Sequence, residues 1–433
     1  MAQISAHAGD AHGHGHHGHH HGPDPLAHDN VHAPGFQRGL SLALLALGAL
    51  ACAGTVLYAL GGDKQAKHAL FSYHIGALMA LGFALGPLGI IMIMHQVAAG
   101  WVVALRRQME NLVSLMPFAL VLLLPSLIFA PKLFKWMSGD PALAEDVIYQ
   151  HKAGWLNPTF FYLRIALYAI VWLALSLRLT GLSLKQDATG DKWLSAKAKT
   201  ISAPGLLLFG LTTAFAGFDL IMSLDFHWFS TMFGVYFFAG NMIASLSLVA
   251  VIGALIVLSG KCKGVITGEH FHDLGKLMLG FTVFWAYITF SQYFLYWYAN
   301  IPEETAWFKL RTSNGWENIG AALIVLHFAV PFLLLLFRDS KRSLAFLALI
   351  GLLLIAAHAL DLFYQVRPIV YKLEGAGQQL IPGKVGFAWV DIAGILGPVG
   401  IFLGLALWRV GTRPLIPLRD PYLPEALEHK NYV

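Results

Sequence analysis

The stretch that decides the fold reads LFSYHIGALMALGFALGPLGIIMIM and covers residues 70–94. It contains no Asp, Glu, Lys or Arg, and it is longer than the roughly 20 apolar residues that a helix needs to cross a bilayer. Comparable runs recur along the chain, in which 57% of the 433 residues are hydrophobic and only 12% are charged. A soluble domain carries about 25% charged residues. The sequence therefore predicts an all-α polytopic membrane protein.

Ten transmembrane helices are expected, because ten apolar runs are near or above the required length. Their predicted ranges are 38–60, 70–104, 111–130, 156–178, 203–223, 227–258, 271–299, 317–337, 343–365 and 385–408. The second, sixth and seventh ranges exceed the thickness of the lipid, so we expect these helices to tilt or to protrude from it.

The distribution of positive charge predicts the orientation of the chain. If the amino terminus lies inside, most of the 29 Lys and Arg residues fall in inside segments. The positive-inside rule then predicts that both termini lie in the cytoplasm. The net charge of +5 is distributed as a topology signal and not as a basic patch for nucleic acid, so no nucleic-acid partner is expected. Because the first 35 residues contain no apolar segment, we expect a retained first helix and no cleavable signal peptide.

The two ends of the chain differ in composition from the predicted membrane domain, residues 37–410. Residues 1–36 hold ten of the 20 histidines among glycines, which is typical of a disordered, solvated tail. A metal-scavenging tail is the alternative, since neutral imidazole is a good metal ligand. The carboxy-terminal segment, 411–433, is rich in proline, and we expect it to lie extended on a partner or on the membrane surface.

The cysteine count limits the redox cofactors that the chain can hold. The two cysteines, Cys52 and Cys262, are too few for an iron–sulfur cluster, and the C-x-x-C-H motif for covalent haem is absent from the sequence. Paired histidines on facing helices could hold haem without a covalent bond, but His95, His327 and His358 lie at three different predicted depths. We therefore expect neither cofactor nor metal on this chain.

Two charged residues are predicted to meet inside the membrane. From the predicted helix ends, Arg164 lies about 10 Å and Asp219 about 8 Å below the same surface, at 1.5 Å per residue. Their helices are neighbours in sequence, and an ion pair is the least costly way to bury both groups.

Other ionisable residues fall within the predicted helices, where such residues are candidates for function. The proton-path candidates are Asp219, Arg164, His358, Asp361, Asp391, His327 and His95. Most of them lie in the outer half of the membrane, with His327 near the middle and His95 in the inner half. Carboxylates and imidazoles can pass protons along water chains, but buried ion pairs that fix helix order are the alternative.

Four further residues are expected at the outer surface, in structural or interface roles. Asp225 precedes the predicted sixth helix and is placed to cap its amino terminus, with His227 beside it at the interface. Glu303 and Glu304 follow a dense belt of aromatic residues. They are expected just outside the membrane, as a solvated loop, a docking patch or a proton exit.

Three motifs resemble one family of membrane subunits. FDLIMSLDFHWFSTMFGVYFFAGN (218–241) and SQYFLYWYANIPEETAWF (291–308) are similar to signature stretches of the F subunit of bacterial alternative complex III. HQVAAGWVVALRRQMENL (95–112) resembles the same subunit and the wider polysulfide-reductase (NrfD-like) membrane family. The resemblance covers residues 38–410 and includes Asp219, Asp225, His227, Glu303 and Glu304 at motif positions.

The resemblance implies ten transmembrane helices, arranged as two four-helix bundles with two peripheral helices, in the bacterial inner membrane. It implies a respiratory quinol:electron-acceptor oxidoreductase whose haem c and iron–sulfur clusters belong to partner subunits. The expected partners are a pentahaem cytochrome, an iron–sulfur subunit, a related quinol-binding membrane subunit, smaller subunits and lipids. The chain itself would be non-catalytic, structural and the carrier of a proton half-channel.

Two other functions remain open at this point. The chain could be the quinol-binding subunit itself, with Asp219, Arg164 and His358 around the quinone head group. It could instead be a secondary transporter, which should show helices broken by Gly or Pro at corresponding positions of two halves. The stretches ALGPLG (84–89) and GILGPVG (394–400) suggest such breaks, but they do not occupy equivalent positions.

Overall fold

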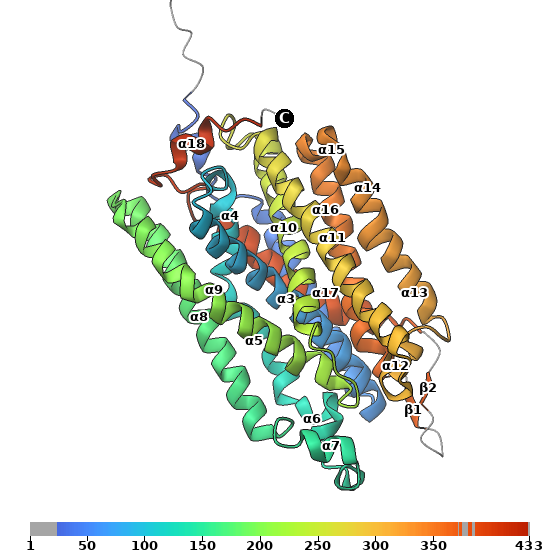
Figure 1. Ribbon diagram of the computed structural model, residues 1–433. Helices are drawn as coiled ribbons and strands as arrows, with labels where there is room; N and C mark the ends of the chain where they lie inside the picture. Colours follow the sequence, from blue (N-terminus) through green and yellow to red (C-terminus); the bar gives the residue numbers. More distant parts are fainter. Residues whose placement is uncertain (1–23, 371, 375–379, 383–385, 432–433) are drawn as a thin grey trace, which may run out of the picture.

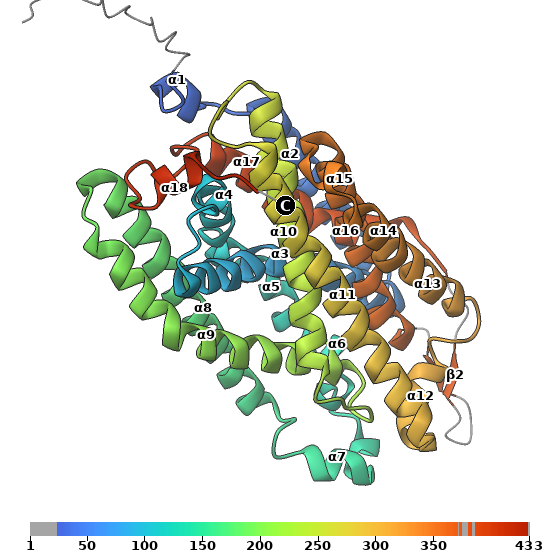
Figure 2. The same cartoon turned by 45° about the horizontal axis from the view of Figure 1, so that its top comes forward.

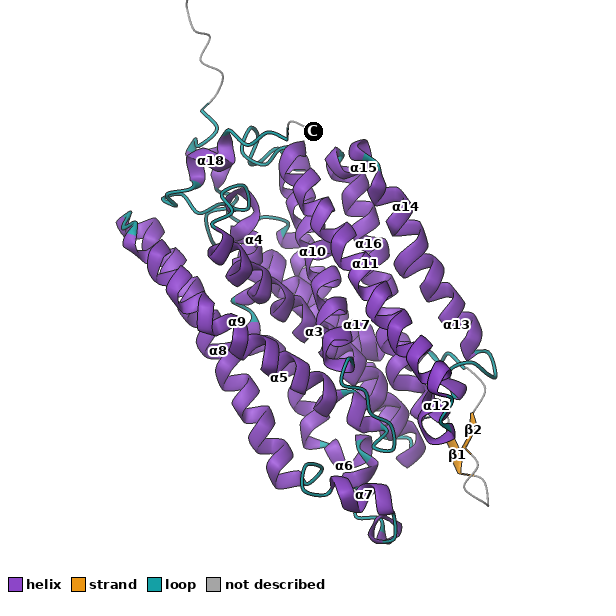
Figure 3. Cartoon of the chain, in the orientation of Figure 1, coloured by secondary structure: helices purple, strands orange, loops and turns teal. Residues whose placement is uncertain are grey.

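The computed structural model describes residues 24–370, 372–374, 380–382 and 386–431. Within these ranges, ten helices are long and apolar enough to cross a membrane, which confirms the all-α polytopic membrane fold (Figures 1 and 3). They span Arg38–Ala59, Asp63–Val97, Val103–Ile128, Pro158–Thr189, Trp193–Leu224, Phe233–Leu258, Gly268–Ala299, Trp316–Leu336, Leu344–Ile369 and Trp389–Val410.

Individual helices and strands carry the labels of Figure 1. The α-helices are α1 (His28–Val31), α2 (Arg38–Ala59), α3 (Asp63–Val97), α4 (Val103–Val113), α5 (Met116–Ile128), α6 (Ala130–Leu133), α7 (Val147–Lys152), α8 (Pro158–Thr189), α9 (Trp193–Leu220), α10 (Phe233–Leu258), α11 (Gly268–Ala299), α12 (Pro302–Lys309), α13 (Trp316–Leu323), α14 (Val330–Leu336), α15 (Arg338–Arg342), α16 (Leu344–Val366), α17 (Trp389–Val410) and α18 (Leu423–Leu427). Short 3-10 turns are η1 (Lys135–Met137), η2 (Pro141–Ala144), η3 (Met222–Leu224) and η5 (Arg367–Ile369), and η4 (Ile324–Ala329) is a π-helical segment between α13 and α14. The strands β1 (Lys372–Glu374) and β2 (Leu380–Pro382) pair antiparallel, with Leu373 opposite Ile381.

The membrane helices form two groups of four and one outer pair. The first bundle contains α3, α4–α5, α8 and α9, and the second contains α10, α11, α13–α14 and α16. The bundles meet along α3 and α10, while α2 and α17 pack on each other and on α3. This is the arrangement that the family resemblance implies.

The two ends of the bundles carry different segments (Figures 1 and 2). We call the end that carries α1 and α18 the tail end, and the end that carries α6, α7 and α12 the loop end. Ten membrane helices lie between α1 and α18 in the sequence. Because this number of crossings is even, α1 and α18 lie at the same end of the bundles.

Helix α3 lies at the centre of the fold. Of its most apolar 18-residue stretch, 94% is buried inside the protein. Its glycines allow neighbouring helices to approach closely, as small residues do in membrane proteins. A Cβ at Gly76 would lie 2.5 Å from the backbone oxygen of Ile395 in α17, and one at Gly86 would lie 1.9 Å from Oγ of Ser245 in α10. The ALGPLG and GILGPVG stretches therefore serve packing, within helices that continue through Pro87 and Pro398.

The predicted boundary between the second and third membrane helices was wrong. Helix α3 ends at Val97, where Ala98 takes a left-handed conformation with φ of 51°, and α4 begins at Val103. All residues of α4 are buried. Arg106 and Arg107 are thus part of a buried helix, which apolar composition could not indicate because ion pairs satisfy its charges.

Both terminal segments pack on the chain itself. Val31 and Phe36 are buried, and the backbone N–H groups of Cys262 and Leu415 donate to the carbonyls of Asn30 and Val31 at 2.9 and 2.8 Å. The order of residues 24–36 corrects the predicted boundary of the disordered tail, and residues 1–23 lie outside the described residues. Apolar residues of the carboxy-terminal segment, among them Leu415, Ile416 and Leu423, are buried against the tail end of the chain itself.

Candidate functional site

Arg164 and Asp219 form the ion pair that the depth count predicts. Arg164 of α8 donates from Nε to Oδ2 of Asp219 at 2.8 Å and from Nη2 to Oδ1 at 2.7 Å. Both side chains are buried, with Arg164 5% and Asp219 0% exposed. Such a two-pronged pair fixes the relative position of α8 and α9.

Neutral donors complete the surroundings of this pair. The Tyr168 hydroxyl donates to Oδ2 of Asp219 at 2.8 Å, and the Trp155 indole donates to Oδ1 at 3.2 Å. The Arg164 guanidinium lies over the rings of Trp155 and Phe160, 4.0 and 4.5 Å from their centroids. The Asp219 carboxylate therefore accepts four hydrogen bonds and is neutralised, so it is suited to holding structure rather than to exchanging protons.

Asp225 does not cap the sixth membrane helix, which corrects the sequence prediction. Helix α10 begins at Phe233 with Met232 at its N-cap position, and the residues before it form an irregular turn. In this turn His227 Nε2 lies 2.7 Å from Oδ2 of Asp146 and Nδ1 lies 3.7 Å from Asp225. The cause of the misplaced helix start is the aromatic sequence FHWF, whose apolar character continues that of the helix.

The turn also anchors the loop that contains α7. Lys152 Nζ donates to the Phe226 carbonyl at 2.6 Å. Burial raises the pKa of Asp146, but hydrogen bonds from the Tyr149 backbone N–H and from His227 outweigh it and hold the pKa below its usual value. His227 is thus a contact between the turn and the loop at the loop end of the first bundle.

Asp361 is the centre of a second buried cluster, in the second bundle. Its carboxylate accepts hydrogen bonds from the Tyr236 hydroxyl, from the Trp285 indole at 3.3 Å and from the Gln365 amide at 3.0 Å. Among the described residues no Lys or Arg pairs with Asp361, although its side chain is only 1% exposed. A buried carboxylate without a cation is costly, which distinguishes Asp361 from Asp219.

Two histidines lie next to this carboxylate. His358 Nδ1 is 4.0 Å from Oδ2 of Asp361, and the rings of His358 and His327 are 6.1 Å apart between centroids. The four ring nitrogens of these histidines are buried without a hydrogen-bond partner among the described residues. His327 lies in η4, and π-helical segments are frequent at functional sites.

Asp391 belongs to a third cluster, at the loop end. Arg367 Nη2 lies 2.6 Å from Oδ1 of Asp391, Ser72 donates to the same oxygen at 2.7 Å, and the Ala388 backbone N–H donates to Oδ2 at 2.8 Å. This carboxylate joins α3, α16 and the start of α17, which is a structural arrangement. The sequence analysis missed Arg367 as its partner because the loop that separates them is long.

The remaining predicted residues do not join these clusters. Glu303 and Glu304 lie in the first turn of α12, where negative side chains interact favourably with the helix dipole. His95 lies near the tail end, where its Nδ1 is 3.1 Å from Oγ of Ser202. Among the described residues, no chain of hydrogen bonds connects His95 to the proton-path candidates in the other half of the membrane.

A charged network at the tail end escaped the sequence analysis. Glu110 of α4 pairs with Arg106 at 3.1 Å and with Arg107 at 2.6 Å, while Asp420 and Asp187 pair with the other ends of these two arginines. Asp420 belongs to the carboxy-terminal segment and lies 314 residues after Arg106 in the sequence. No local spacing signals such a contact.

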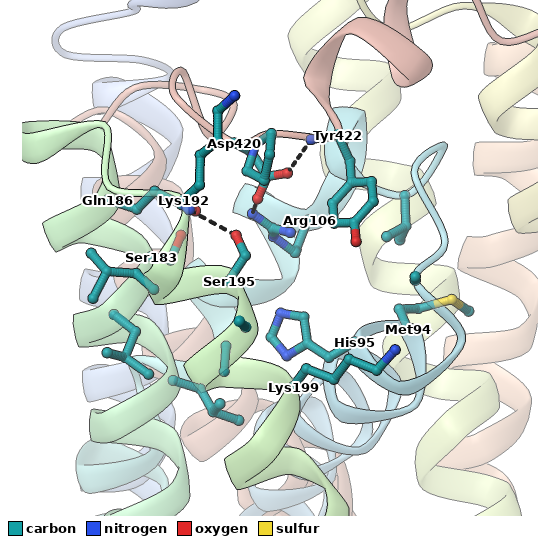
Figure 4. A pocket seen from close by; sticks show the side chains of 18 of the residues that line it. Met94, His95, Arg106, Ser183, Gln186, Lys192, Ser195, Lys199, Asp420 and Tyr422 are labelled. Atoms are coloured by element: carbon teal, nitrogen blue, oxygen red, sulfur yellow. Dashed lines mark hydrogen bonds and ion pairs between the residues drawn. The ribbon is translucent and has the colours of Figure 1, made fainter.

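A cavity of about 360 Å³ lies beside this network (Figure 4). It is bounded by α3, α4, α8, α9 and the carboxy-terminal segment. Its polar lining includes His95, Arg106, Ser183, Gln186, Lys192, Ser195, Lys199 and Asp420. His95 points into the cavity, and the Tyr422 ring extends toward it from the opposite side (Figure 4).

The fold and these clusters define a multi-pass helical membrane protein with several paired buried charges. Within the described part of the chain, it also holds a buried carboxylate, Asp361, that no Lys or Arg pairs with. No model of a known protein family matches the chain, and no curated protein matches it significantly.

Proposed function

We propose that this chain is a membrane subunit of a respiratory quinol:electron-acceptor oxidoreductase of the alternative complex III type. In this proposal it holds no redox cofactor, it lies in the bacterial inner membrane with both termini in the cytoplasm, and its second bundle handles protons at Asp361. Haem c and iron–sulfur clusters belong to the partner subunits named above.

Sequence motifs support the assignment to this complex. The three motifs form the end of α3 with α4, the connection from α9 to α10, and the end of α11 with α12. They contain residues of specific clusters, such as Asp219 and Glu110, so their resemblance reflects more than shared apolar character.

The single observation that carries the proton-handling proposal is the environment of Asp361. Three neutral donors surround its carboxylate, and no Lys or Arg among the described residues pairs with it. Such a group can exchange a proton with neighbouring water, whereas Asp219 is tied to Arg164 by two hydrogen bonds. The proposed proton path therefore rests on Asp361, His358 and His327, and Asp219 becomes a structural residue.

The alternative of a quinol-binding subunit has less support. It requires Asp219, Arg164 and His358 around one head group, but His358 belongs to the Asp361 cluster and the other two residues pair in the first bundle. The transporter alternative requires corresponding breaks in two halves. Among the described helices, the break between α4 and α5 lies in the second membrane helix of the first bundle. The π-helical segment η4 lies in the third membrane helix of the second bundle, so the two interruptions do not correspond.

Mild solubilisation followed by affinity purification of the tagged chain tests membership of the complex. We expect covalently bound haem and iron to co-purify with the chain, together with a second NrfD-like membrane subunit. Recovery of a homogeneous, haem-free chain under conditions that preserve other respiratory complexes would contradict the proposal. A photoreactive quinone that labels this chain rather than the related subunit would favour the quinol-binding alternative.

A further inference from the structure

The cavity at the tail end combines an apolar wall with a basic rim. Leu179 and Leu182 of α8, together with Met94, Leu194 and Ala198, contribute to the apolar wall. Lys192 and Lys199, which precede and follow the first turn of α9, line the cavity and are exposed. A chamber of this composition matches a molecule with an apolar chain and a polar head.

The charges of the cavity fall into two groups. Arg106 is neutralised by Glu110 and Asp420, so it contributes a fixed, paired wall. Lys192 and Lys199 form no ion pair with any described residue. The net free charge around the cavity is therefore positive, which favours an anionic head group over a neutral or cationic one.

The position of the cavity favours a lipid over a soluble anion. Trp193, between the two lysines in sequence, is 70% exposed, and Trp residues in membrane proteins concentrate at the level of lipid head groups. Leu207 and Leu211 lie further along α9 and are 66% and 50% exposed, as expected for a surface that faces hydrocarbon. Basic pockets between membrane helices are typical sites for anionic phospholipid head groups.

We propose that this cavity binds one anionic phospholipid. Lys192 and Lys199 supply positive charge at the rim that attracts the phosphate, Gln186 and Ser195 border the polar head region, and an acyl chain lies against Leu179 and Leu182. The carboxy-terminal segment closes the other side, because Asp420, Pro421 and Tyr422 line the same cavity. The site is independent of the proposed respiratory function, since it uses none of the residues of the Asp361 cluster.

The test compares the full chain with the double variant Lys192→Gln/Lys199→Gln, in detergent. Lys197→Gln is the matched control, because Lys197 lies on the same helix turn but does not line the cavity. Native mass spectrometry measures retained lipid, and thermal unfolding is followed with added phosphatidylglycerol, phosphatidylcholine, inorganic phosphate or a quinone. The exposed lysines can be replaced without disturbing the core, so loss of folding is not expected.

We expect wild type and Lys197→Gln to bind phosphatidylglycerol, and the double variant to bind it about tenfold or more weakly, since it lacks both positive charges that attract the anionic head group. Phosphatidylcholine and inorganic phosphate should stabilise the protein far less. Equal binding by the double variant would overturn the proposal. Stabilisation by phosphate alone, or by the quinone in preference to the lipid, would also overturn it, by assigning the cavity to a soluble anion or to a quinone.

Discussion

Arg164 and Asp219 contact each other through two parallel hydrogen bonds of 2.8 and 2.7 Å in the interior of the first bundle. No comparable cation holds Asp361 in the second bundle among the described residues, where the nearest basic group is His358 at 4.0 Å. The two bundles thus differ in the groups that surround a buried carboxylate. One carboxylate is fixed by its charge partner, and the other is left with neutral donors.

Replacing either partner of the first pair should destabilise the protein. Arg164→Leu leaves Asp219 buried without its cation, and breaking one side of a buried pair costs about 3–5 kcal/mol. Thermal unfolding in detergent checks this, with Arg164→Leu/Asp219→Leu as the control that should recover part of the loss. Single variants as stable as wild type would show that the pair is not structural.

Adding a side chain at Gly76 should disrupt the contact between α3 and α17. The new Cβ would meet the backbone of Ile395 at 2.5 Å, and backbone cannot move aside as a flexible side chain can. For Gly76→Val we expect a loss of about 1–3 kcal/mol or more, which is the usual cost of overpacking. Gly210→Val is the control, since a Cβ there meets nothing within 4 Å, and equal unfolding temperatures for the two variants would refute the packing role.

The loop that contains α7 should detach from the first bundle in acid. The pKa of Asp146 is lowered in the folded protein by the Tyr149 N–H and by His227, against the opposing effect of burial. A group with a lowered pKa stabilises the fold above its unfolded pKa, about 3.9 for Asp, and this contribution disappears as the pH falls through the folded value. Limited proteolysis of the loop at pH 7 and below pH 4 measures the change, and Asp146→Asn should be cleaved alike at both values. A wild-type loop that remains protected in acid would contradict the expectation.

Removing Asp420 should weaken the attachment of the carboxy-terminal segment. In Asp420→Ala, Arg106 of α4 loses one of its two carboxylates but keeps Glu110. We expect faster hydrogen exchange in residues 415–427, while Glu428→Ala, further along the same segment, should leave the exchange unchanged. Unaltered exchange in Asp420→Ala would mean that burial of Leu415 and Ile416 alone holds the segment.

The sequence predicted the features that depend on local composition or on helix depth. Ten membrane helices follow from apolar run lengths, and the contact between Arg164 and Asp219 follows from their equal depth on neighbouring helices. The sequence could not reveal α4 as a buried helix, because its charges look like a loop until Asp187 and Asp420 are brought beside them. These partners come from distant parts of the chain.

The candidate site was predicted only in part for the same reason. His358 and Asp361 share a helix face and were found together, but Tyr236 and Trp285 come from two other helices and carry no charge that marks them. The start of α10 was misjudged because the turn that precedes it is as aromatic as a helix. Depth identified the buried carboxylates, but only the tertiary contacts distinguish a neutralised one from an unpaired one.

Proton release during quinol oxidation, measured in the intact complex in vesicles, tests the central proposal most directly. Asp361→Asn retains the shape of the side chain and removes its titratable proton, and electron transfer is recorded in parallel as a check on assembly. The account predicts fewer protons translocated per electron in Asp361→Asn, and a smaller effect in His227→Gln, which lies outside the cluster. An unchanged ratio of protons to electrons in a fully assembled Asp361→Asn complex would contradict it.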